Sequence, residues 1–233
     1  MELRGDFMVG KLFFIGVVIV LPLCFFFYAC YKRRFIAFLL GVLAFVISQM
    51  VIRIPILNFI AKESSTFQLW NATKPILIIL LLAVSAGIFE ETARFVAMRF
   101  FLKKQTLHNG IVFGLGHGGI EALLLVGIPA ITHPLLSSAP LFASGVERIC
   151  AMTIHVCLSI IVLLGIKRNQ FYYCGLTIVI HSLINFIIGY LARDQSLVFV
   201  EFTLVLLTAI LGFITYQISR RKFNDEKMEI HSV

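Results

Sequence analysis

Seven long apolar runs occupy most of the sequence. An α-helix needs about 20 apolar residues to cross the hydrocarbon layer of a membrane. Runs of that kind lie at about 8–30, 35–57, 75–101, 107–128, 146–166, 171–191 and 197–218. We therefore expect an all-α fold, a polytopic transmembrane helix bundle of about seven spans.

The composition excludes a soluble globular enzyme. Hydrophobic residues make up 60% of the chain and charged residues 14%, against about 45–50% and about 25% in soluble domains. So few charges cannot cover a water-facing surface. The formal net charge of +8 does not indicate a nucleic-acid partner, because cytoplasmic loops of membrane proteins carry excess Lys and Arg. We expect the lipid bilayer as a partner and no nucleic acid.

Basic residues follow alternate apolar runs. The clusters are Lys32–Arg34, Lys103 with Lys104, Lys167 with Arg168, and Arg220–Lys222. The positive-inside rule places these loops in the cytoplasm. This predicts an N-terminus outside and a C-terminus inside, which agrees with an odd number of spans.

Polar and ionisable residues concentrate in the four runs between residues 75 and 191. An ionisable residue at the centre of a span costs at least about 2.5–3.5 kcal/mol, so it is a functional candidate by default. The set comprises Glu90, Glu91, Arg94, His117, Glu121, Glu147, Arg148, His155, His181 and Asn185. We accordingly divide the chain into two N-terminal helices with an outer loop (1–74), a four-helix catalytic core (75–191), and a last helix with a cytoplasmic tail (192–233).

Four of these residues lie at a common depth. Counted from the nearest basic or cytoplasmic flank at a rise of 1.5 Å per residue, Glu91 and His155 lie ~18 Å deep. His117 and His181 lie ~15 Å deep by the same count. Four helices thus place a carboxylate or an imidazole near the bilayer midplane, where the groups are expected to meet.

Spacing within the helices supports a common site. Three pairs stand four residues apart: Glu90 with Arg94, His117 with Glu121, and His181 with Asn185. Residues at this spacing share a helix face, so Glu90 and Arg94 can pair. Glycines at 114, 116, 118 and 119 allow another helix to approach His117 closely.

Glutamate and histidine in one buried site are suited to the activation of water. The carboxylate takes the proton, while the imidazoles bind a metal ion or hydrogen-bond the water. An Asn amide can stabilise an oxyanion. The sequence contains no Ser in a Gly-x-Ser-x-Gly context and no phosphate-binding glycine pattern. Hydrolysis of a peptide bond within the membrane fits this set best.

Three motifs on separate helices resemble those of the CAAX-protease and bacteriocin-processing superfamily of intramembrane proteases. They are Glu90-Glu91-x-x-Arg94, Phe113-x-x-x-His117 and His181-x-x-x-Asn185. The Gly-His-Gly-Gly-Ile-Glu run at 116–121 and the helix with Glu147, Arg148 and His155 resemble the YhfC branch in particular, which is related to PrsW. The resemblance covers residues 85–190 and suggests a bacterial plasma membrane.

The resemblance implies a glutamate-dependent or metallo-type peptidase. By motif position, Glu90 or Glu91 is the general base, Arg94 holds the carboxylates, His117 and His181 orient the water or bind a metal, and Asn185 stabilises the oxyanion. The CAAX-type motif usually has three residues between Glu-Glu and Arg, whereas this chain has two. Both glutamates therefore stay candidates for the base.

Several alternatives stay open at this point. A metal, zinc if any, is expected at His117, His155 and His181, with no other cofactor. Glu121 and His155 are either ligands or residues that orient ligands, and Glu147 with Arg148 is expected to form a pair at the outer entrance. The expected partner is a membrane-embedded or lipidated peptide or protein. The competing functions are a proton- or ion-coupled transporter and an inactive membrane scaffold.

Overall fold

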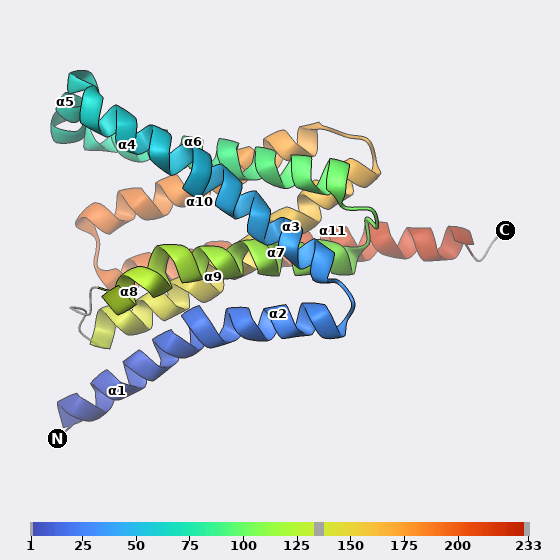
Figure 1. Ribbon diagram of the computed structural model, residues 1–233, viewed down its shortest axis with the longest axis horizontal. Helices are drawn as coiled ribbons and strands as arrows, with labels where there is room; N and C mark the ends of the chain where they lie inside the picture. Colours follow the sequence, from blue (N-terminus) through green and yellow to red (C-terminus); the bar gives the residue numbers. More distant parts are fainter. Residues whose placement is uncertain (1, 133–137, 231–233) are drawn as a thin grey trace.

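The computed structural model describes residues 2–132 and 138–230, and both segments are built from helices without a strand (Figure 1). The first span consists of α1 (Glu2–Ile15), η1 (Gly16–Val20) and α2 (Leu21–Tyr31). The second consists of α3 (Phe35–Phe45), η2 (Val46–Arg53) and α4 (Ile54–Glu63), and α5 (Ser65–Thr73) follows it. The third consists of α6 (Pro75–Val96) and η3 (Ala97–Phe101). The fourth span consists of α7 (Leu107–Glu121), η4 (Ala122–Gly127) and α8 (Ile128–Thr132). The last three spans are single helices: α9 (Ser138–Lys167), α10 (Tyr172–Asp194) and α11 (Leu197–Ile230). The η segments are π-helical turns that continue the neighbouring α-helices.

Seven helices within the described residues are long and apolar enough to cross a membrane, as expected. They run over Met8–Tyr31, Phe35–Glu63, Pro75–Phe101, Leu107–Ala130, Pro140–Lys167, Tyr172–Asp194 and Leu197–Arg220. Helix α9, which carries the fifth span, begins at Ser138, earlier than the expected 146. Its Pro140 is accommodated because a proline is tolerated in the first turn of a helix. The orientation of the termini and the three-part division of the chain stay predictions.

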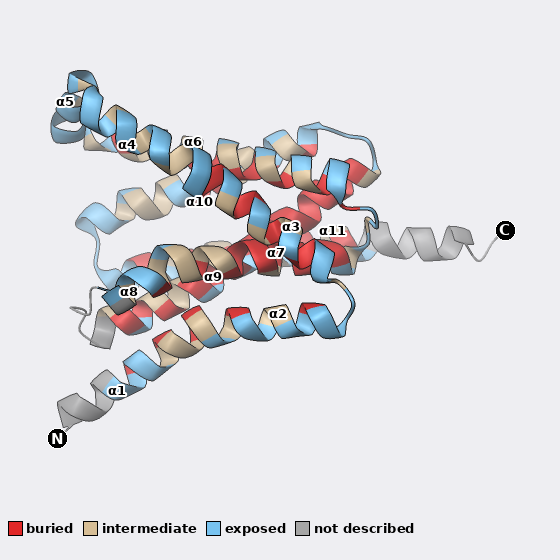
Figure 2. Cartoon of the chain, viewed as in Figure 1, coloured by how far each residue is buried: buried red, intermediate tan, exposed pale blue. Residues whose placement is uncertain are grey.

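Helix α9 is the central helix of the bundle. Its membrane-spanning window is 78% buried, whereas 22% of the window is buried in the spans at either end of the chain. Leu158, Val162 and Leu163 on α9 are almost completely enclosed. Figure 2 shows the same contrast, with buried residues gathered on α7 and α9 and exposed residues on the outer faces. Many of the exposed residues are large and apolar. Exposed apolar faces of this kind suit contact with lipid.

The glycines of α7 allow its backbone to lie directly against two neighbours. A Cβ atom at Gly114 would come within 2.5 Å of the Val156 Cα atom on α9. A Cβ atom at Gly116 would come within 2.3 Å of the Phe38 carbonyl oxygen on α3. Only glycine permits both approaches. Helix α7 is thereby held between α3 and α9, which places His117 in the interior.

Candidate metal centre

Helix α6 turns one face toward the interior of the bundle. Gly87, Glu90, Glu91 and Arg94 are all buried on it, and their spacing of three and four residues places them on one side of a helix. Gly87 packs against α10, where a Cβ atom would meet the Ser182 Oγ atom at 2.3 Å. This close contact brings the two glutamates next to the histidine of α10.

Three imidazoles converge on one oxygen atom of Glu90. Oε2 of Glu90 lies 3.0 Å from Nε2 of His117 on α7, 3.9 Å from Nε2 of His155 on α9 and 4.0 Å from Nε2 of His181 on α10. The four residues come from four helices, and each is buried. The expectation that these spans meet at one depth agrees with this arrangement.

Glu91 has a different set of partners. Both of its carboxylate oxygens lie 2.5 Å from Nη1 of Arg94, and its Oε1 lies 2.8 Å from Nδ1 of His181. The pairing of Arg94 with Glu90, which the i, i+4 spacing favoured, is therefore wrong. Residues three and four positions apart are both neighbours on a helix, so Arg94 can reach either glutamate. Glu90 instead contacts side chains of other helices.

His155 connects Arg94 to a second carboxylate. Its Nδ1 lies 2.7 Å from Nη2 of Arg94, and its Nε2 lies 2.5 Å from Oε2 of Glu121. Arg148 donates from Nη1 to Oε1 of Glu121 at 3.0 Å and also pairs with Glu147, as the sequence predicted for these two residues. A continuous series of polar contacts thus runs from Glu147 to the centre.

Two further polar residues come from the second span, outside the four runs to which the sequence analysis assigned the site. Gln49 in η2 is buried and donates from Nε2 to Oε1 of Glu90 at 2.7 Å. Arg53 donates to Oε1 of Gln49 at 2.8 Å and to the Leu82 carbonyl oxygen at 2.7 Å. The sequence did contain a pattern that could have identified them, because Gln49 and Arg53 are also polar residues four positions apart within an apolar run.

A polar cavity of about 160 Å³ adjoins the centre. The buried residues Glu90, His155 and His181 line it. Glu147, whose side chain is 40% exposed, and the exposed Asn185 also line it. Since one water needs only about 10–15 Å³ of accessible space, the cavity has room for several. Asn185 thus shares the cavity with His181, as their spacing suggested.

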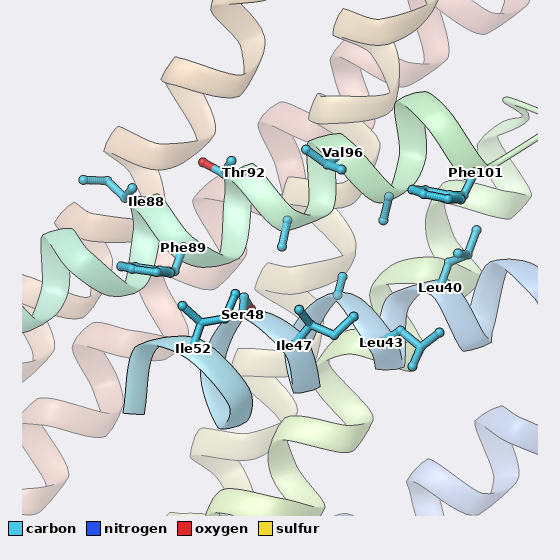
Figure 3. A pocket seen from close by; sticks show the side chains of 13 residues that line it. Leu40, Leu43, Ile47, Ser48, Ile52, Ile88, Phe89, Thr92, Val96 and Phe101 are labelled. Atoms are coloured by element: carbon cyan, nitrogen blue, oxygen red, sulfur yellow. The ribbon is translucent and has the colours of Figure 1, made fainter. Parts of the chain in front are cut away.

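A larger cavity of about 560 Å³ lies on the other side of α6 (Figure 3). It is bounded by apolar side chains of the second and third spans, among them Leu43, Ile47 and Phe89, with Ser48 and Thr92 as its polar lining residues. None of its lining residues also lines the polar cavity. The ionisable groups of α6 therefore face the interior, and its outer face is apolar.

The residues around Glu90 fit a divalent metal ion. One ligand atom each of Glu90, His117, Glu121 and His155 lies within 4.8 Å of the others. Ligand atoms around a tetrahedral zinc, bound at about 2.0–2.2 Å, stand roughly 3.3 Å apart. No Lys or Arg of the described chain forms an ion pair with Glu90. A buried carboxylate without a guanidinium partner needs positive charge from another source, and His and Glu ligands suit zinc and other first-row divalent ions.

The fold and the site together define a multi-pass membrane protein with a buried glutamate–histidine centre able to hold a metal ion. The chain belongs to the YhfC intramembrane metalloprotease family, whose model matches residues 13–140 and 129–211. It is 29% identical over 161 residues to the "Uncharacterized membrane protein YhfC" of Bacillus subtilis (strain 168). That match covers 55% of this chain and 60% of the relative. No solved structure matches. The resemblance drawn from the sequence motifs is thereby confirmed.

Proposed function

We propose that this protein is an intramembrane endopeptidase that hydrolyses a peptide bond of a membrane-embedded or lipidated protein or peptide. The observation that carries the proposal is the convergence of three imidazole Nε2 atoms on Oε2 of Glu90, inside a bundle of membrane-spanning helices. The adjoining polar cavity supports it, because hydrolysis needs water at that depth. The family's description as metalloproteases points to the same class of reaction.

Glu90 is the general base in this proposal. Both oxygens of Glu91 are occupied by Arg94, whereas Oε2 of Glu90 faces the imidazoles beside the cavity. A base must have an oxygen within hydrogen-bond reach of the attacking water. Glu91 then holds His181 in place rather than taking the proton.

The other groups at the site polarise the scissile carbonyl, move the proton and stabilise the oxyanion. A divalent metal ion held at the Glu90 centre would supply Lewis-acid polarisation of the scissile carbonyl. Glu90 takes a proton from the water that attacks the carbonyl and returns it to the leaving amine. Asn185, which lines the same cavity, donates its amide N–H to the developing oxyanion.

The test compares membrane protein fragments in cells that express the wild-type chain or the Glu90→Gln variant. New N-termini are identified by mass spectrometry. The matched control is Glu63→Gln, at an exposed residue whose one ion pair within the described part of the chain is with Lys62. Fragments present with wild type and Glu63→Gln but absent with Glu90→Gln support the proposal. Identical fragments in all three strains contradict it, and proton or ion flux through liposomes that contain the purified protein would favour a transporter instead.

A further inference from the structure

Arg94 contacts two different groups with its two terminal nitrogens. Nη1 lies 2.5 Å from each oxygen of Glu91, and Nη2 lies 2.7 Å from Nδ1 of His155. A guanidinium has donors and no acceptor. Nδ1 of His155 must therefore present a lone pair to Arg94 and carry no proton.

The proton of a neutral His155 is consequently on Nε2. This nitrogen lies 2.5 Å from Oε2 of Glu121. Oε2 of Glu121 has no hydrogen-bond partner among the described residues, so this contact is an ion pair by distance, in which the carboxylate charge favours a proton on the nitrogen beside it. Glu121 is in turn held by Arg148 through its other oxygen. Arg94 thus fixes the tautomer of His155, and the charge of Glu121 favours the same tautomer from the opposite side of the ring.

His181 is held in the opposite tautomer. Its Nδ1 lies 2.8 Å from Oε1 of Glu91, a carboxylate that already accepts from Arg94 and can only accept again. Nδ1 of His181 therefore carries the proton, and the Nε2 lone pair points toward Glu90, 4.0 Å from its Oε2. A carboxylate behind a histidine in this way is the usual support of a metal-binding imidazole.

We infer that His155 is a positioning residue outside the metal's ligand set, and that the imidazole ligands are His117 and His181. This inference rests on the proposed function, since it assigns roles within that site. A metal on Nε2 of His155 would require a proton on Nδ1, directed at the N–H of Arg94. His155 instead holds Glu121 beside the centre. Nδ1 of His117 has no hydrogen-bond partner among the described residues, so nothing there fixes the tautomer of this ring. Its Nε2, which hydrogen-bonds to Oε2 of Glu90 at 3.0 Å, can exchange that contact for a metal ion as the proton moves to Nδ1.

The first experiment measures Zn²⁺ affinity of the purified full chain in detergent by chelator competition, for wild type and for single Gln variants of His117, His155 and His181. Glutamine can accept from Arg94 and donate to Glu121, so His155→Gln keeps both contacts of the imidazole. We expect His155→Gln to retain affinity within about tenfold, whereas His117→Gln and His181→Gln lose roughly 100-fold or more, beyond the range of outer-shell changes. Size-exclusion elution and helical circular dichroism verify that each variant is folded.

The second experiment records ¹⁵N NMR of histidine-labelled wild-type protein without added metal, with the His155 signals assigned by their loss in His155→Gln. The expected spectrum shows the Nε2-protonated tautomer for His155. Detection of the Nδ1-protonated form overturns the inference, as does a folded His155→Gln variant that loses zinc as severely as His117→Gln. If the wild-type protein binds no divalent metal, the assignment of His117 and His181 as ligands is overturned. The tautomer measurement still decides the role of His155, and the cleavage assay still decides the proposed peptidase.

Discussion

Gln49 donates a hydrogen bond of 2.7 Å to Glu90, which joins the second span to the carboxylate at the centre of the site. Arg53 holds Gln49 in turn, with a donor 2.8 Å from its Oε1 atom. The oxygen of Glu90 that Gln49 contacts is Oε1, so Oε2 is left to face the three imidazoles. The second span therefore belongs to the structure that orients the proposed base.

Replacing Gln49 with leucine tests this orientation. The change removes the donor to Glu90 and leaves Oε1 buried without its partner, which costs about 1.5–3 kcal/mol for a hydrogen bond to a charged group. We expect lower peptidase activity and a lower denaturation midpoint in detergent. Gln195→Leu, at an exposed position, is the matched control, and equal activity of both variants would contradict a role for Gln49.

The two adjacent glutamates should respond differently to the same substitution. Glu90→Gln removes the proposed base and is expected to lower the cleavage rate by about 10²–10⁴-fold with the protein still folded. Glu91→Gln leaves Arg94 buried with its charge uncompensated, which is expected to destabilise the fold by about 3–5 kcal/mol. Cleavage assays and chemical denaturation of both variants distinguish the two effects, and a fully stable but inactive Glu91→Gln variant would reverse the assignment.

The contact between α7 and α9 can be tested at Gly114. A Cβ atom there would lie 2.5 Å from the Val156 Cα atom, so Gly114→Ala must separate the helices. Overpacking of this kind typically costs about 1–3 kcal/mol. We expect a lower thermal midpoint and weaker activity, because His117 moves with α7. Gly175→Ala, where nothing lies within 4 Å, should leave the thermal midpoint unchanged or slightly raised.

Removal of divalent metal tests the proposed chemistry directly. Exhaustive chelation of the purified protein is expected to abolish cleavage, and added Zn²⁺ should restore it, because His and Glu ligands favour such ions over Mg²⁺. Metal content is measured alongside activity. Full activity in protein with no detectable metal would show that Glu90 acts without one.

The sequence alone determined the number of spans, their approximate ends, the shared depth of the ionisable residues and the family. These follow from properties of each segment by itself: the length needed to cross a bilayer, the cost of placing charge within it, and the spacing of motifs along one helix. The seven expected spans agree with the structure for this reason.

Only the tertiary structure decided which glutamate faces the centre and what each histidine contacts. Positions three and four residues from Arg94 are both neighbours on α6, so the choice of Glu91 as its partner depends on what other helices offer to Glu90. Gln49 supplies a donor to Glu90 from the second span, and His117 approaches it from α7. Contacts between helices distant in sequence depend on how closely the backbones pack, and here the glycines of α7 permit that approach.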